Sequence, residues 1–461
     1  MDTLHTEQDA AGTLSATGQL FDLGPADTPP AAPPACHEGA PRLRYANRAQ
    51  MSMRCCSLDD LIPEDHPVRI VWDYVAGLDL AAILRKIAAT EGQPGAPAID
   101  PRILMSLWLY ATLRGVGSAR ELNRRCDRQQ GEVPFQWICG DVRVNYHTLA
   151  DFRTAHGKIL DDLLTSSVAT LRHEGLVQME RVAQDGMKVR ASAGASSFRR
   201  RQTLEECLVE AEQQIQALKA EVDSPSAGQR RRQKARQRAA QDRQRRVQRA
   251  LEQLPAVEAQ KKAADKEQAR VSTTDADARV MKMGDGGFRP AFNVQLATDT
   301  ETQIITGVDV SNSGGDQGKM APMVHQLEER YQQAPKEMLV DGGFVKKEDI
   351  EEVSPPQAGT TVYAPVQKSK DPTRDAHTPR ADDAPAVAEW RQRMATDAAK
   401  EIYKERASTA ECVNAHARNH GLQQFRVRGV DKVKATVLWY VLAHNLIRAA
   451  ALRALRDAAI K

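Results

Sequence analysis

The order of extended and helical segments after residue 176 constrains the fold of this chain more than any other feature. Strands are expected within 176–198 and at about 291–297, 303–310, 338–341 and 361–364. The second and third of these alternate with a period of two and are joined by a short polar turn, which predicts a hairpin. Helical segments separate the later strands. A sheet that begins antiparallel and gains strands through helical crossovers indicates an α/β layer fold.

Helices complete this part of the chain. They are expected over 319–331, from about 347, over 389–418 and over 431–459. The complete order is strand, long insertion, two paired strands, helix, strand, helix, strand and helix. It matches the ribonuclease-H-like arrangement, in which a mixed sheet carries flanking helices.

A helical insertion, at 199–270, interrupts this order after the first strand. Its first apolar residues follow the 4-3-4-3 spacing of a coiled-coil seam, at Leu204, Leu208, Ala211, Ile215, Leu218 and Val222. Residues 224–228, Ser-Pro-Ser-Ala-Gly, break the helix, and a second helical run continues to about 264. The insertion is therefore predicted to be an antiparallel helical hairpin. One chain can close such a seam, so it does not by itself indicate a dimer.

The second helical run of the insertion is strongly basic. From residue 230 to residue 249 its arginines include Arg230, Arg231, Arg232, Arg236 and Arg238, against the single acid Asp242. A run of charge is often only a solvated helix face. Because this run is almost entirely of one sign, contact with DNA phosphates is the favoured interpretation. Such contact would bind DNA without reading its sequence.

Two regions precede the first strand. Residues 1–45 are rich in Ala, Pro, Gly, Thr and Asp and are predicted to be a disordered leader. Residues 46–175 read as helices, one of which opens with the capping box Ser118-Ala119-Arg120-Glu121. A helix-turn-helix-like DNA-binding module and a generic helical bundle both fit this block. If it reads bases, the helices near 118–128 or 145–156 are the candidates.

Composition favours an intracellular protein. Of the 461 residues, 5% are aromatic and 27% are charged, and the seven cysteines form no CxxC pair. Free thiols in a reducing compartment are the expected state. The N-terminus has no signal-peptide pattern, and no apolar run approaches the length of a membrane span. We therefore expect a cytoplasmic protein with no membrane partner.

Two of the predicted strands end in an aspartate followed by glycine. Asp185 follows Val182-Ala183-Gln184, and Asp341 follows Met338-Leu339-Val340. Phosphodiester chemistry needs an activated oxygen nucleophile, a stabilised leaving oxygen and charge neutralisation, and two Mg²⁺ ions supply all three. Mg²⁺ prefers hard oxygen ligands, so the two aspartates fit two ligand positions.

A third carboxylate is expected on the helix over 389–418. Glu411 is favoured over the other glutamates of that helix because it has cations on both sides. Lys404 and Arg418 lie seven residues before and after it and would share its face. This neighbourhood suits a metal site next to a phosphate backbone.

Several motifs resemble those of the DDE transposases of bacterial insertion sequences. They are Asp185-Gly186-Met187-Lys188-Val189-Arg190-Ala191, Gly315-Asp316-Gln317, Val340-Asp341-Gly342-Gly343-Phe344 and Leu442-Ala443-His444-Asn445-Leu446. The helical block, with Gly117-Ser118-Ala119-Arg120-Glu121-Leu122, resembles the InsH-like N-terminal domain of these proteins. The resemblance covers about residues 45–455. It implies a ribonuclease-H-like DDE catalytic domain over 176–461, interrupted by the insertion.

The resemblance also implies roles for individual residues. In that family two Asp and one Glu bind the metals, which here are Asp185, Asp341 and Glu411, with two Mg²⁺ or Mn²⁺ ions. These three residues are expected to be both the catalytic residues and the metal ligands.

The helix around the glutamate carries a family signature, Tyr-x2-Arg-x3-Glu-x6-Lys. Tyr403 and Arg406 match it, the gap to Glu411 is four residues instead of three, and Arg418 stands in the Lys position. Arg418 supplies a planar fork for phosphate in place of a point charge. We expect these residues, with Lys404, to lie on the DNA.

The function implied is that of an insertion-sequence transposase. It would bind the element's terminal inverted repeats, cleave strands by two-metal hydrolysis and join the freed 3′-hydroxyl to target DNA. Its partners would be double-stranded DNA and further copies of the chain, as a homodimer or higher oligomer, at the bacterial nucleoid. Two alternatives remain: an inactive DNA-binding or regulatory protein with the same fold, and a nuclease without strand transfer.

Three other polar residues have structural interpretations. Asp316 is expected to cap the helix that follows it. Asp285-Gly286-Gly287 repeats the pattern found at Asp341 but is interpreted as a turn. His444 lies in an apolar helix and is interpreted as a core histidine with satisfied hydrogen bonds.

Overall fold

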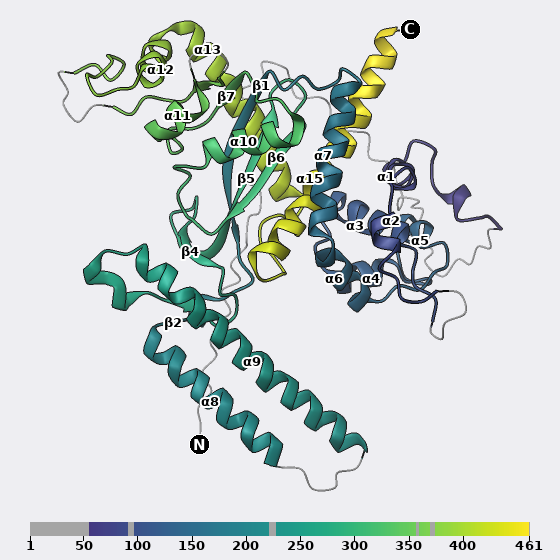
Figure 1. Cartoon of the computed structure of the whole chain (residues 1–461). Helices are drawn as coiled ribbons and strands as arrows, with labels where there is room; N and C mark the ends of the chain where they lie inside the picture. The colour runs from purple at the N-terminus through teal and green to yellow at the C-terminus, as the bar shows by residue number, and fades with distance from the viewer. Residues whose placement is uncertain (1–54, 91–95, 221–226, 356–358, 369–373, 461) are drawn as a thin grey trace, which may run out of the picture. The chain divides into compact units, whose positions relative to one another are not determined.

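A computed structural model of the chain describes residues 55–90, 96–220, 227–355, 359–368 and 374–460. The predicted leader at 1–45 lies outside the described residues, and so do the side chains of Arg230 and Arg231. The helices and strands all belong to one unit, Cys56–Lys461 (Figure 1).

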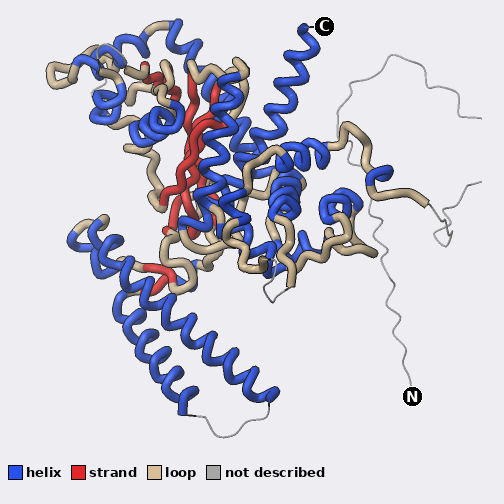
Figure 2. Tube along the Cα trace, turned by 45° about the vertical axis from the view of Figure 1, so that its right-hand side comes forward, coloured by secondary structure: helices blue, strands red, loops and turns tan. Residues whose placement is uncertain are grey.

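A mixed sheet of six strands forms the centre of the described part of the chain. The strands are β1 (Arg181–Arg190), β4 (Arg279–Lys282), β5 (Phe288–Asp299), β6 (Ile305–Ser311), β7 (Glu337–Leu339) and β8 (Thr361–Tyr363). β1 pairs antiparallel with β5 on one edge and parallel with β7 on the other, and β7 pairs parallel with β8. Both β4 and β6 pair antiparallel with β5. The predicted α/β fold with a mixed sheet is confirmed (Figure 2).

The hairpin formed by β5 and β6 is the most deeply buried part of this sheet. Every residue of β5 from Pro290 onward is buried, so the strand is covered on both faces. Helix α10 (Met320–Tyr331) lies directly against β6, since a Cβ built on Gly307 would come within 2.6 Å of the Met323 sulfur. Close packing here explains why the sequence has glycine inside a strand.

The helices before the sheet form one packed block. They are α1 (Pro67–Ala76), α2 (Ala81–Leu84), α3 (Pro101–Leu113), α4 (Ala119–Arg125), α5 (Val133–Cys139), α6 (Tyr146–Ala155) and α7 (Gly157–His173), after a short 3₁₀ turn at Asp59–Leu61. Asp100 and Asn145 accept backbone N–H bonds at the starts of α3 and α6. Helices α6 and α7 are separate, because the chain leaves helical geometry at His156.

The insertion consists of two long helices, α8 (Arg201–Ala220) and α9 (Ala227–Ala259), which pack against each other. Arg201 pairs with Glu258, and Arg243 pairs with Glu210, so the two helices run in opposite directions. A short ribbon of β2 (Phe198–Arg199) and β3 (Val271–Ser272) joins the two ends of the insertion, and a 3₁₀ turn at Ala263–Gln268 precedes β3. The buried residues between the helices include Leu204, Ala211, Ile215, Ala240, Val247, Ala250 and Leu254.

The helices after the sheet differ from the prediction. The expected single helix over 389–418 is divided into α12 (Pro385–Ala395), α13 (Asp397–Arg406), a π-helical segment (Ala407–Glu411) and α14 (Cys412–Asn419). Thr396 separates the first two, because its extended backbone and its side-chain cap to the Ala399 N–H start a new helix. A further short helix, α11 (Lys347–Val353), lies between β7 and β8.

The last helix, α15 (Val430–Ile460), is long and apolar enough to cross a membrane by length and composition, which the sequence reading did not expect. In the structure, 61% of its most apolar window is buried. It packs against α3, α6, α7 and β6. These contacts are those of a core helix.

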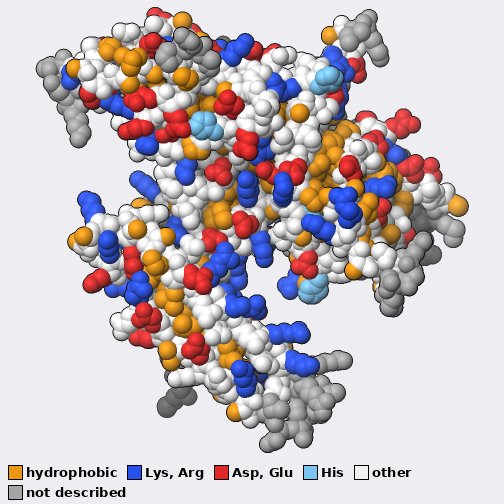
Figure 3. Space-filling view, viewed as in Figure 1, with side chains coloured by type: hydrophobic (Ala, Val, Ile, Leu, Met, Phe, Trp, Pro, Cys, Tyr) orange, Lys and Arg blue, Asp and Glu red, His pale blue; other side chains and the backbone are white. Residues whose placement is uncertain are grey.

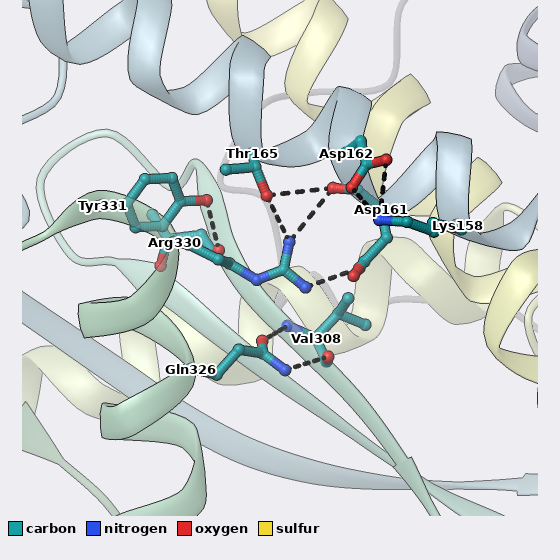
Figure 4. A network of polar contacts seen from close by, with 9 residues as sticks. Lys158, Asp161, Asp162, Thr165, Val308, Gln326, Arg330 and Tyr331 are labelled. Carbon is teal, nitrogen blue, oxygen red and sulfur yellow. Dashed lines mark hydrogen bonds and ion pairs between the residues drawn. The ribbon is translucent and has the colours of Figure 1, made fainter. Parts of the chain in front are cut away.

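A buried ion pair joins the N-terminal helices to the sheet (Figure 4). Arg330 of α10 has only 8% of its side chain exposed and donates to Asp161 Oδ1 at 2.6 Å and to Thr165 Oγ1 at 2.9 Å, both on α7. Nearby, Gln326 of α10 bonds both backbone groups of Val308 in β6. Helix α10 is thus fixed to the sheet on one side and to α7 on the other.

Prediction one concerns this ion pair. Replacing Arg330 by Met leaves the half-buried Asp161 without its cation and should destabilise the protein by about 2 kcal/mol or more. The matched control is Lys158→Met, which removes an exposed pair with Asp162 on the same helix and should cost less than about 0.5 kcal/mol. The measurement is the midpoint of urea unfolding. Equal midpoints for the two variants would contradict the role given to Arg330.

Candidate active site

Asp185 lies in the middle of β1. Its backbone is opposite Leu296 of β5, and Gly186 is opposite Gln295, so the pairing of the strands continues through the Asp-Gly motif. The prediction that the strand ends at Asp185 is therefore wrong. The reason is the length of β5, which pairs with β1 as far as Arg190.

The side chain of Asp185 is held by the helices after the sheet. Only 20% of it is exposed. Its Oδ2 accepts a hydrogen bond from Asn414 Nδ2 at 2.9 Å, and Arg406 Nη1 lies 3.8 Å from its Oδ1. The carboxylate on the central strand is therefore oriented by α13 and α14.

The electrostatic surroundings of Asp185 oppose its negative charge. Burial raises the pKa of this carboxyl above its ordinary value, and the carboxylates of Asp341 and Asp316 raise it further. The guanidinium of Arg406 and the N–H of Gly186 act in the other direction. Negative charge is thus concentrated in a partly buried place, and a bound cation would relieve this repulsion.

Asp341 lies two residues beyond the end of β7. That strand runs parallel to β1 and pairs with it at Arg181–Ala183, so its carboxyl end approaches Asp185. Asp341 Oδ1 accepts a hydrogen bond from the Gly343 N–H at 2.6 Å. The effect of Asp341 on the pKa of Asp185 agrees with this placement. The structure therefore brings these two predicted site residues together.

Glu411 is placed differently. Its side chain is 63% exposed, and its Oε1 lies 3.4 Å from Arg406 Nη2. Arg406, which is 14% exposed and lies over the ring of Tyr403, contacts Asp185 with its other terminal nitrogen. The guanidinium of Arg406 thus lies between Asp185 and Glu411.

The π-helical segment accounts for the unusual spacing of the helix signature. A π turn contains one more residue than an α turn and usually appears as a short bulge within a helix, often at a functional site. Here it covers Ala407–Glu411, the residues between the matching arginine and the glutamate. The π-helical segment therefore accommodates the extra residue between Arg406 and Glu411, and the helix continues as α14.

Asn414 is a site residue that the sequence reading missed. It is buried and donates to Asp185. It follows Glu411 by three residues, so it lies on the same side of the helix. The three-residue spacing from Glu411 could have indicated Asn414 as a site residue. It was missed because an uncharged asparagine is not a typical metal ligand.

The expected capping role of Asp316 is wrong. Helix α10 begins at Met320 without a side-chain cap. Instead Asp316 Oδ1 accepts hydrogen bonds at 2.7 Å from both Asn293 and Gln295 on β5. A Cβ on Gly186 would lie 2.3 Å from the same oxygen. Gly186 therefore leaves room for Asp316 to approach the central strand.

The cations expected around Glu411 are separated in the structure. Lys404 is exposed and pairs with Glu401 at 2.6 Å. Arg418, near the end of α14, lines a cavity together with Arg190. Residues seven apart share a face only in an unbroken α-helix, and the π-helical segment changes that register.

Asp285 and His444 have the structural roles that the sequence predicted for them. Asp285 lies in the tight turn between β4 and β5 and pairs with Arg289 at 2.7 Å. His444 Nε2 donates to the Gln303 carbonyl at 2.9 Å, and burial lowers its pKa to about 4. Both side chains have structural partners of their own.

The basic run on α9 is partly neutralised. Arg243 pairs with Glu210, Arg245 with Asp242, and Arg249 with Asp277. Among the described residues of α9, no ion pair involves Arg232, Lys234, Arg236, Arg238 or Arg246. Figure 3 shows Lys and Arg side chains along this helix. The cations without a carboxylate partner are concentrated toward the start of α9.

The donors around Asp185 suit a divalent cation. As the side chains lie, no group of three His, Cys, Asp or Glu residues in the described part of the chain is arranged to hold a metal ion. The carboxylates of Asp185 and Asp341 are nevertheless hard oxygen donors that repel each other. These residues fit a cation, whereas Glu411 is screened by Arg406.

Two family models match the chain. Residues 56–155 match a model described as a transposase domain (DUF772), and residues 367–450 match one described as a transposase DDE domain. The second match includes Glu411 but neither Asp185 nor Asp341. No curated protein and no solved structure matches the chain.

Prediction two concerns Gly186. Its replacement by Ala places a methyl group against Asp316 and should destabilise the protein by about 1–3 kcal/mol. The control is Gly284→Ala, because a Cβ at that exposed turn meets nothing within 4 Å. The measurement is the thermal midpoint of each variant. If Gly186→Ala has the same thermal midpoint as the wild type, the close approach of Asp316 does not restrict the side chain at position 186.

Proposed function

We propose that the chain is a DDE transposase of the insertion-sequence type, and that Asp185 and Asp341 form the centre at which it cuts and joins DNA. The observation that carries the proposal is their position. One lies on the central strand and the other at the carboxyl end of the parallel strand beside it. The strand arrangement, with β5 and β6 on one side of β1 and β7 and β8 on the other, also favours a ribonuclease-H-like domain over 176–461.

A DDE transposase domain implies dependence on divalent metal ions in general. We propose two Mg²⁺ or Mn²⁺ ions held by Asp185 and Asp341. When bound, such ions supply an activated oxygen nucleophile and neutralise charge on the phosphodiester. Asn414 fixes Oδ2 of Asp185, so the orientation of this carboxylate is set before any ligand arrives.

Glu411 is the third proposed ligand and needs a rearrangement. Its exposed side chain has freedom to turn, but Arg406 occupies the space toward Asp185. We propose that Arg406 exchanges its carboxylate partners for a DNA phosphate. That exchange would open the place between Asp185 and Glu411, and guanidinium groups bind phosphates in two-pronged geometry. DNA and metal would then assemble the site together.

The N-terminal block is proposed to bind the ends of the element. Helices α4 and α6 pack against each other, as expected if they form a module that reads bases. The hairpin of α8 and α9 is proposed to contact flanking phosphates, with a homodimer or higher oligomer assembled on the DNA. Cleavage would free a 3′-hydroxyl that attacks target DNA.

Prediction three tests the catalytic assignment. Asp185→Asn and Asp341→Asn should each lower Mg²⁺-dependent nicking by at least about a hundredfold, since a metal ligand is lost. The substrate is plasmid DNA carrying the sequences that flank the gene. Asp285→Asn, in the turn before β5, is the matched control and should nick like the wild type.

The binding of the same DNA separates the remaining outcomes. Both site variants should still bind it, which distinguishes lost chemistry from lost folding. Wild-type nicking without joined products would indicate a nuclease. Equal nicking by wild type and Asp341→Asn would contradict the proposed site.

Prediction four concerns the cations on α9. A triple variant, Arg232, Arg236 and Arg238 to Gln, should flatten the dependence of log K on log salt by up to about three, because each phosphate contact contributes about 0.9 to the slope. The control is Arg245→Gln, whose guanidinium already pairs with Asp242 and should change the slope less. Identical slopes in all three proteins would mean that α9 does not contact DNA.

A further inference from the structure

A cavity of about 330 Å³ is lined by residues of the N-terminal helices, the end of β1 and the loop before α15. Four arginines line it: Arg153, Arg190, Arg418 and Arg426. No Asp or Glu is among the described residues that line it. The cavity therefore has a strongly positive lining with no internal counter-charge.

Arg153 of α6 is the buried member of this set. It is only 7% exposed, its Nη1 donates to the Gly117 carbonyl at 2.6 Å, and its guanidinium lies 4.8 Å from the centre of the Trp108 ring. Its Nε is buried without a hydrogen-bond partner. Buried charges in proteins are normally paired, because leaving one unpaired costs several kcal/mol.

Arg426 adds a second positive charge beside it. A Cβ on Gly117, whose carbonyl accepts from Arg153, would lie 3.8 Å from Arg426 Nε. Burial and the neighbouring Arg426 together lower the pKa of Arg153 to about 10. Two guanidinium groups thus repel each other in a place where neither has a carboxylate partner among the described residues.

The arrangement is built into the core and is not a chance meeting of surface side chains. The backbone of Arg190, the last residue of β1, is hydrogen-bonded to Gln423 and Phe425 of the loop before α15. The carbonyl of Arg153 accepts from the buried Trp439 Nε1 at 2.9 Å. The loop that carries Arg426 and the helix that carries Arg153 are therefore fixed relative to β1.

We propose that this cavity binds a phosphate group of the DNA backbone, through Arg153, Arg190 and Arg426. A phosphodiester supplies the negative charge and the acceptor oxygens that these guanidinium groups lack. The proposal rests on the proposed function for the identity of the ligand. It assigns a fixed phosphate-binding point that is separate from the basic face of α9.

The position on β1 makes this point useful to the reaction. Asp185 and Arg190 are five residues apart on one strand, which is about 16 Å at about 3.3 Å per residue. That corresponds to about five base-pair steps of B-form DNA. A duplex anchored in the cavity is therefore long enough to reach the carboxylates.

The first arm of the test uses inorganic phosphate as the probe. At constant ionic strength, phosphate in place of chloride should raise the thermal midpoint of the wild type by about 2 °C or more. Arg426→Gln and Arg190→Gln should lose this rise, whereas Arg428→Gln, an exposed arginine outside the cavity, should keep it. Loss of the rise in Arg428→Gln as well, or its absence in the wild type, would overturn the cavity as an anion site.

The second arm identifies the source of the phosphate. The slope of log K against log salt for duplex DNA should fall by about one in Arg426→Gln. If the phosphate response is lost but the slope is unchanged, the cavity binds a small anion and the DNA assignment is wrong. If the wild type binds no DNA, the proposed function fails, while the first arm still reports on the cavity. Both experiments replace exposed arginines, whose loss should not prevent folding. Neither needs a variant of the buried Arg153.

Discussion

The carboxylate of Asp185 is the point on which the rest of the structure depends. It lies on the central strand, yet its side chain is held by Asn414 and faced by Arg406, both from helices more than two hundred residues later. Burial and two neighbouring carboxylates make its charge unfavourable. The Asp185 side chain therefore connects the sheet to the helices that follow it. A cation bound there would offset the repulsion between the carboxylates and so stabilise the packing of these elements.

The π-helical segment connects the family signature to this geometry. It lies between Arg406, which contacts Asp185, and Asn414, which bonds it. In a regular α-helix, Arg406 and Asn414 would lie at a different angle to each other around the helix axis. The additional residue therefore lets both side chains reach Asp185, while Glu411 remains exposed.

The sequence predicted the features that depend on local patterns. Alternation gave β5 and β6, the capping box gave the start of α4, and the heptad spacing gave the apolar face of α8. It failed where a distant partner decides the outcome. β1 continues past Asp185 because β5 pairs with it, and Asp316 bonds β5 instead of capping a helix. Asn414 and the cavity around Arg153 arise from packing between segments far apart in the chain, which no local pattern reveals.

The central claim is that Asp185 and Asp341 hold divalent cations. Its most direct test is a titration of the protein with Mn²⁺, in which electron paramagnetic resonance counts the bound ions with and without DNA carrying the gene's flanking sequences. We expect two bound ions for the wild type with DNA and a loss of binding in both Asp185→Asn and Asp341→Asn, with Asp285→Asn unchanged. Mn²⁺ binding that is the same in all four proteins would contradict it.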